Sequence, residues 1–302
     1  MVAKTKKISG KRVMFLKLNN EKRGWIFIIP AFIFLMLLYI FPLIQSFIKS
    51  FLNSSGEWNS FINYSTLIKD TIFWVSLKNT FLFTVASVIL HLLIGLFLAI
   101  LLNLKLNPAV MNFFRGILIL PWLVATVVAG SIWKLIYHPV GILNYILTTL
   151  HILKQPISWL GDPKLALMAV VLVNVWKYYP LFFVTLLAGL KTIPNELYEA
   201  AEVDGAKAYQ SFFHITLPSL KEIIVFMGLL DFIWTLRHFD LVYIMTGGGP
   251  MDSTELLSHY IYQVSFRNLQ LNYGSTIAEF ALIISLIFSV VYLYINRRRE
   301  QV

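Results

Sequence analysis

The sequence predicts an all-α membrane protein with six transmembrane helices. Of its 302 residues, 58% are hydrophobic and only 13% are charged, and the mean hydropathy is +0.73. Soluble domains contain about 45 to 50% apolar and about 25% charged residues, so the shortage of charge is the sharper departure. Six spans of about 20 residues use roughly 120 residues, and the remaining loops are too short for a second globular domain. A large soluble ATPase or hydrolase domain is therefore excluded.

Basic residues gather at both ends of the chain. The formal net charge is +10, with a basic segment at 1–24 and an arginine-rich tail at 297–302. By the positive-inside rule both termini are then cytoplasmic, which requires an even number of spans. This placement argues against nucleic acid as a partner, which the same charge would suggest in a soluble protein. The chain has no cysteine, so it forms no disulfide and no thiolate metal site.

Gaps between charged residues define a membrane domain at 25–296. Its spans are predicted at 24–48, 79–104, 116–133, 165–190, 222–245 and 274–296. The first span also resembles the apolar core of a signal peptide, but residues 51–54 supply no small-residue cleavage site. The first three spans are free of charge, whereas the fourth and the sixth hold Lys177 and Glu279.

The fifth predicted span is the least apolar, because it holds Asp231, Arg237 and Asp240. A charge near a helix centre costs about 2.5 to 3.5 kcal/mol, whereas each Leu or Ile returns only about 0.3 to 0.6 kcal/mol. We therefore expect this span to insert against its neighbours and to turn its charges toward protein or a water-filled path. Structural ion pairs, Arg237 with Asp240 and Lys177 with Glu279, are the alternative.

The connection at 191–221 is polar and patterned, and with cytoplasmic termini it lies inside, whereas 49–73, 135–163 and 246–273 lie outside. Pro194 suits the first turn of a helix, and residues 195–202 continue with good helix formers. Asp204-Gly205 is a turn, and a second short helix at about 206–214 is expected to end at Leu217-Pro218. Such a pair presents small and acidic side chains that another protein can grip. An interfacial helix on the lipid surface is the alternative.

Several motifs in the chain resemble those of a known family. Glu199-Ala200-Ala201, with Asp204-Gly205-Ala206 and Leu217-Pro218 after it, is similar to the EAA loop of permease subunits of bacterial ABC importers. Phe239-Asp240-Leu241, Thr246 to Pro250 and Trp159-Leu160-Gly161-Asp162-Pro163 resemble the carbohydrate-uptake branch of that family. The likeness covers nearly the whole chain from about residue 20.

The resemblance implies a permease subunit that does no chemistry itself. It would pair with a second homologous permease on two ATPase subunits, which use ATP and Mg, and receive a sugar, oligosaccharide or polyol from an extracellular or periplasmic solute-binding protein. Its place would be the bacterial plasma membrane. The loop would form a cytoplasmic coupling helix between spans four and five, with Glu199 as the charged contact to the ATPase. Ala200 and Ala201 would allow close approach, and Gly205 would orient the two short helices.

Intramembrane polar and aromatic residues are the candidates for the translocation path. They are Lys177, Tyr178, Asp231, Trp234, Arg237, His238, Asp240 and Glu279. The glycine-rich segment Gly247, Gly248, Gly249 and Pro250 is expected outside, as a turn or as a contact for the binding protein.

An enzyme is not expected, because the sequence has no G-x-x-x-x-G-K-[ST], G-x-S-x-G or H-E-x-x-H motif and offers no catalytic residue. The six histidines form no ligand-like pair at helical spacing, so neither a metal nor another cofactor is expected. The alternative function is a secondary transporter driven by an ion gradient, with the charges of the last three spans as relays. It predicts inverted repeats with matching broken helices, and the charge-free first half argues against them.

Overall fold

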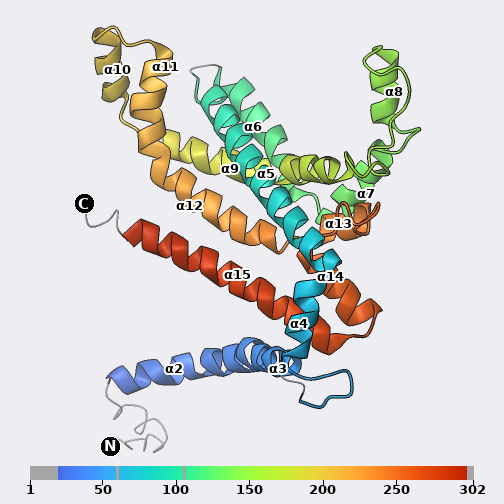
Figure 1. The fold of residues 1–302 in the computed structure, drawn as a ribbon. Coiled ribbons are helices and arrows are strands. Elements are labelled where there is room, and N and C mark those ends of the chain that lie inside the picture. Colours follow the sequence, from blue (N-terminus) through green and yellow to red (C-terminus); the bar gives the residue numbers. More distant parts are fainter. Residues whose placement is uncertain (1–19, 59–60, 105–106, 298–302) are drawn as a thin grey trace, which may run out of the picture.

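The computed structural model describes residues 20–58, 61–104 and 107–297, so most of the two basic ends lies outside the described residues. Within the described part the regular structure is helical, apart from one isolated bridge between Leu52 and Trp58 (Figure 1). The predicted all-helical class is confirmed.

Among the described residues, four helical segments are long and apolar enough to cross a membrane, and a bent pair of helices is a fifth if the pair forms one span. The four are Phe27–Ser50, α5 (Thr71–Leu101), α9 (Ala166–Leu190) and the Leu271–Val290 part of α15 (Leu271–Arg297). The first consists of α2 (Asn20–Leu35), a π-helical turn η1 (Met36–Ile40) and α3 (Phe41–Ser50). They match four of the predicted spans.

The third predicted span, 116–133, is bent rather than continuous. Helix α6 (Pro108–Leu123) and helix α7 (Thr126–Ile136) meet at an angle of 97°, with Val124 and Ala125 extended between them. A break inside an apolar layer frees backbone groups that need new partners. Lys177 of α9 supplies one, because its Nζ donates to the Val124 carbonyl oxygen.

The fifth predicted span, 222–245, also differs. Helix α12 runs from Leu217 to Leu236, a short break follows, and helix α13 covers Asp240–Met245. Helix α12 is 20 residues long, but Lys221, Glu222 and Asp231 keep it outside the group of helices that are apolar enough to cross. Six spans are therefore not established by length and apolarity alone. At the break the His238 carbonyl oxygen accepts a hydrogen bond from Ser258 Oγ.

The second span begins earlier than predicted, at Thr71 instead of residue 79, because Asp70 caps it. The Asp70 Oδ1 atom accepts the N–H groups of Ile72 and Phe73 at 2.9 and 3.2 Å, and Oδ2 accepts two tyrosine hydroxyls from α14 and α15. Burial raises the pKa of Asp70, but these four hydrogen bonds outweigh it, so the pKa lies below its ordinary value.

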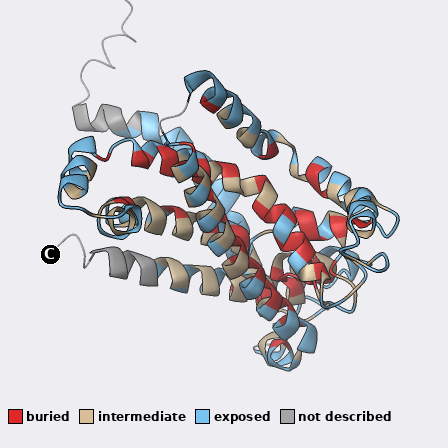
Figure 2. Ribbon diagram, turned by 90° about the horizontal axis from the view of Figure 1, so that it is seen from above, coloured by how far each residue is buried: buried red, intermediate tan, exposed pale blue. Residues whose placement is uncertain are grey.

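Helices α5 and α9 form the centre of the fold, and Figure 2 shows buried residues concentrated in the interior helices. Their crossing is close because Gly95 faces Phe182. A Cβ atom added at Gly95 would lie 2.5 Å from the Phe182 Cβ atom and 3.0 Å from the Phe183 nitrogen. Helix α12 packs on α5 and α9, and α3 packs on α15.

Shorter helices fill the connections. They are α4 (Ile62–Lys69), α8 (Ile142–Thr149), α10 (Asn195–Val203), α11 (Ala208–Ser211), the π-helical turns η2 (Phe212–Thr216) and η3 (Gln263–Arg267), and α14 (Leu257–Tyr262). Helices α10 and α11 lie near the C-terminal end of α5, and α13 and α14 lie toward its N-terminal end (Figure 1).

Candidate functional site

The 191–221 connection folds into two short helices around a tight turn, as the sequence predicts. Gly205 has a φ of +76° after the end of α10. The Ala206 N–H donates to the Ala201 carbonyl oxygen at 2.8 Å, and the Gly205 N–H donates to that of Glu202 at 3.0 Å. These two bonds form a Schellman motif, which needs a left-handed residue at this place and so favours glycine.

The predicted break at Leu217-Pro218 is wrong. Helix α11, the turn η2 and helix α12 follow one another with helical backbone angles at Phe212, Thr216 and Leu217. Proline lacks the N–H that a regular helix needs, and the wider π-turn directly before Pro218 accommodates the loss. The second short helix is therefore the beginning of a longer rod, which we define as Ala208–Leu236.

One face of α10 and its turn lies exposed at the surface of the protein. Glu199, Ala200, Asp204 and Gly205 are exposed, Ala201 and Ala206 are half-buried, and Val203 at the tip is 87% exposed. Tyr198 points the other way, and its hydroxyl lies 2.9 Å from Thr216 Oγ1. Behind it a cavity of about 490 Å³ separates the pair of helices from the end of α5.

A buried polar contact joins α12 to the two central helices. The Asp231 Oδ2 atom lies 2.7 Å from His91 Nδ1, and the Thr235 hydroxyl donates to Asp231 Oδ1 at 3.2 Å. The other nitrogen of His91, Nε2, lies 3.3 Å from the Asn174 carbonyl oxygen on α9. His91 is fully buried and Asp231 is 6% exposed. Sequence reasoning missed His91, which lies in a charge-free span and gives no local signal.

The two ion pairs considered as alternatives do not form. Among the described residues the ion pairs are His91–Asp231 and His259–Glu255. Lys177 is 4% exposed, contacts the bend at Val124 and lies 5.1 Å from the centroid of the Tyr178 ring. Glu279 is buried as well.

The remaining path candidates gather around the break between α12 and α13. Trp234, Arg237 and Asp240 are exposed there, and Tyr178 and His238 are half-buried. The His238 ring stacks on Phe83 with centroids 5.5 Å apart. A largely apolar cleft of about 400 Å³ opens beside Arg237, between α3, α5, α12, α14 and α15. The structure thus separates the candidates into a buried group and an exposed group.

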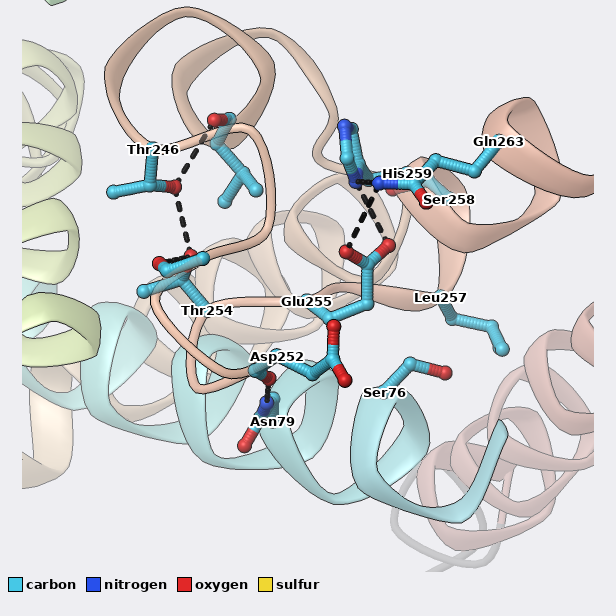
Figure 3. Close-up of polar contacts among 12 residues, drawn as sticks. Ser76, Asn79, Thr246, Asp252, Thr254, Glu255, Leu257, Ser258, His259 and Gln263 are labelled. Carbon is cyan, nitrogen blue, oxygen red and sulfur yellow. Dashed lines mark hydrogen bonds and ion pairs between the residues drawn. The ribbon is translucent and has the colours of Figure 1, made fainter. Parts of the chain in front are cut away.

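The glycine-rich loop is contacted by the side chains of Thr254 and Glu255 (Figure 3). Thr254 Oγ1 lies 2.7 Å from both Thr246 Oγ1 and the Gly249 carbonyl oxygen. Gly248 has a φ of +89°, and a Cβ atom there would lie 1.8 Å from Glu255 Oε2, so only glycine fits. Beyond the loop, Met251 is 89% exposed.

The carboxylate under the loop belongs to a second buried pair that sequence reasoning missed. Glu255 Oε1 lies 2.7 Å from His259 Nδ1, one helical turn away, and Gln263 Nε2 lies 3.5 Å from Glu255 Oε2. The spacing of four residues is the signal that could have found it. Two contacts tie this region to α5: Asn79 Nδ2 donates to the Asp252 carbonyl oxygen at 2.9 Å, and the Leu257 N–H donates to Thr80 Oγ1 at 2.8 Å.

Neither pair is a metal site by number of ligands. Within the described ranges no group of three or more His, Cys, Asp or Glu side chains is arranged to hold a metal ion.

Comparison with known proteins gives consistent results. Residues 91–301 match the family model described as binding-protein-dependent transport system inner membrane component. The chain is 34% identical to the trehalose/maltose transport system permease protein of Thermococcus litoralis, over 94% of this chain and 97% of that protein. It is 37% identical to the sulfoquinovosyl glycerol transport system permease protein of Agrobacterium fabrum, over 95% and 94%. The fold is similar to a chain of a bacterial ABC transporter that imports the acidic polysaccharide alginate, with a TM-score of 0.82, 21% identity, and coverage of 92% and 96%.

Proposed function

Because this chain belongs to the family of binding-protein-dependent transport system inner membrane components, we propose that it forms half of a carbohydrate path in an ABC importer. As a permease subunit it is not an enzyme, and ATP and Mg would be used by its ATPase partners. The names of its relatives, which transport trehalose, maltose and sulfoquinovosyl glycerol, support a carbohydrate as cargo.

The observation that carries the proposal is the exposed group at the α12–α13 break. Trp234, Arg237 and Asp240 are exposed at the end of a helix that packs among apolar spans. Charged side chains at membrane depth face protein or water rather than lipid. An aromatic face beside hydrogen-bonding charged groups suits a sugar ring, so we place the path along these three residues, completed by a second homologous permease.

The buried candidates take a different part in the proposal. Lys177 and Asp231 already have partners inside the chain, and with Glu279 they would shape the path from behind. Tyr178 and His238 are half-buried beside the exposed group and would pack underneath it.

We place the ATPase contact on the exposed face of α10. Glu199 and Asp204 would meet basic side chains of the ATPase, and Ala200 and Ala201 would allow close approach. Val203 at the tip would enter an apolar hollow. The Schellman turn at Gly205 would set the direction of α10 relative to the rod Ala208–Leu236. Two ATPase subunits would serve the pair of permeases.

The proposed topology follows from the position of these segments along α5. The α10–α11 hairpin lies near one end of this helix, and the glycine-rich loop lies toward the other. With α10 in the cytoplasm, the 247–250 loop is outside, where a solute-binding protein would contact it. Helix α12 would then be the fifth of six spans, both termini would be cytoplasmic, and the protein would lie in the bacterial plasma membrane.

The first test is to purify the tagged chain from its own host in mild detergent and identify co-purifying proteins. We expect an ATPase and a second permease, and ATP-driven uptake of a carbohydrate after reconstitution with the binding protein. Glu199→Ala should lower uptake while solute binding to the binding protein is kept, and Glu57→Ala, at an exposed glutamate far from α10, should not. A chain that is recovered alone and transports under an ion gradient would refute the proposal.

A further inference from the structure

The rod Ala208–Leu236 connects the two ends of the proposed mechanism. Its backbone stays helical through η2 and α12, and at 1.5 Å per residue it is about 44 Å long. One end follows the α10 turn directly. The other ends at the break that exposes Trp234 and Arg237. A displacement of α10 is therefore carried along the rod to this break, and it reaches the central helices only if the rod moves together with them.

Most contacts of the rod with the central helices are apolar. A Cβ atom at Gly228 would lie 3.3 Å from Leu92 Cδ1 on α5, and one at Gly189 on α9 would lie 2.6 Å from Ile223 Cδ1. In lipid such contacts have no hydrophobic driving force, since the acyl chains are as apolar as the side chains. Apolar packing alone therefore resists sliding of the rod against α5 and α9 only weakly. Interhelical hydrogen bonds fix the position of the rod more specifically.

The polar contact between the rod and both central helices is made by the His91–Asp231 pair. His91 of α5 contacts its carboxylate at 2.7 Å and the Asn174 carbonyl oxygen of α9 at 3.3 Å. Thr235, one turn later on the rod, donates to the other carboxylate oxygen. One side chain, His91, thereby joins three helices at a point about 9 Å along the rod from Arg237. Its burial keeps water from replacing either contact.

We propose that His91 and Asp231 are positioning residues that clamp α12 to α5 and α9, so that the three helices move as one body during transport. This inference rests on the proposed function. With the clamp, a displacement at α10 moves α5 and α9 together with the exposed group at the break. Without it, the rod slips against α5, and ATP hydrolysis proceeds without an equal movement of the path.

The functional test compares uptake with ATP hydrolysis in the reconstituted transporter. In Asp231→Leu we expect ATP hydrolysis to continue and the number of solute molecules moved per ATP to fall by at least about fivefold, the lower end of coupling between distant sites. Asp231→Asn keeps a hydrogen-bond acceptor and should retain most of the coupling. Ser87→Ala is the matched control, because it removes a buried hydroxyl of α5 that has no hydrogen-bond partner among the described residues.

These outcomes separate the two proposals. Failure of the wild-type complex to transport with ATP refutes the proposed function. If the wild type transports and Asp231→Leu assembles with unchanged transport per ATP, the clamp is refuted alone. An assembled Asp231→Asn variant that is as uncoupled as Asp231→Leu also refutes it.

A distance measurement tests the clamp without any change at the pair. The chain has no cysteine, so spin labels can be placed at Leu93→Cys on α5 and Phe226→Cys on α12, both at exposed positions. We expect their distance in the complete complex to be the same without nucleotide and with trapped ATP. A change of several ångströms in the otherwise unaltered chain would overturn the inference.

Discussion

Gly95 offers the sharpest test of the close crossing of α5 and α9. This crossing positions both the exposed face of α10 and the break between α12 and α13. In Gly95→Ala the new Cβ atom would lie 2.5 Å from Phe182 Cβ and 3.0 Å from the Phe183 nitrogen. Neither neighbour can rotate away, because one is a Cβ atom and the other is backbone. Overpacking of this kind costs about 1 to 3 kcal/mol. The better helix propensity of alanine returns at most about 1 kcal/mol, so we expect a net loss of stability.

Gly116→Ala is the matched control, because it is also inside a helix but a Cβ atom there would meet nothing within 4 Å. This variant should be unchanged or more stable by up to about 1 kcal/mol. The measurement is thermal unfolding of the purified complex in detergent, together with the yield of assembled complex. A Gly95→Ala protein as stable as Gly116→Ala would refute the close crossing of α5 and α9.

Changes at three other positions test single contacts. Lys177→Met removes the donor at the bent span and leaves the Val124 carbonyl oxygen unpaired, so thermal stability should fall by about 1 kcal/mol or more. Gly248→Ala adds strain of about 1 to 2 kcal/mol at positive φ and a collision with Glu255, and chymotryptic cleavage near the loop, at the exposed Met251, should become faster. Asp70 has a lowered pKa, so its contribution to stability is complete above its unfolded pKa of about 3.9 and is lost as pH falls through the folded pKa. The unfolding temperature measured from pH 6 to 3 should show this loss in the wild type, and Asp70→Asn should lack that part of the pH dependence.

Hydropathy predicts the helical class and most spans because it depends on composition summed over many residues. It misses the breaks at Val124 and after Leu236, where the deciding contacts come from elsewhere in the chain. Lys177 supplies the donor at the first break, and Ser258 supplies it at the second. A rule that ends helices at charges also misplaces the start of α5, since a capping aspartate is a better boundary than Lys78.

The candidate site shows the same division between local and distant information. The turn at Gly205 is legible because a Schellman motif has a local sequence signature. Asp231 is recognisable as a charge in a span, but its partner His91 lies 140 residues away in a segment that otherwise reads as lipid-facing. The path candidates fall into a buried group and an exposed group. This division depends on how the helices pack together, which the sequence of one span does not specify.

The chain order of the buried partners has a consequence for biogenesis. The spans made first, Phe27–Ser50 and α5, contain few charged residues and can enter the membrane unaided. Helix α12 is made later and carries Asp231, whose partner on α5 is by then already in place. Lys177 likewise follows the carbonyl group that it contacts. The emerging protein thus never has to hold either charge in lipid while its partner is still to be translated.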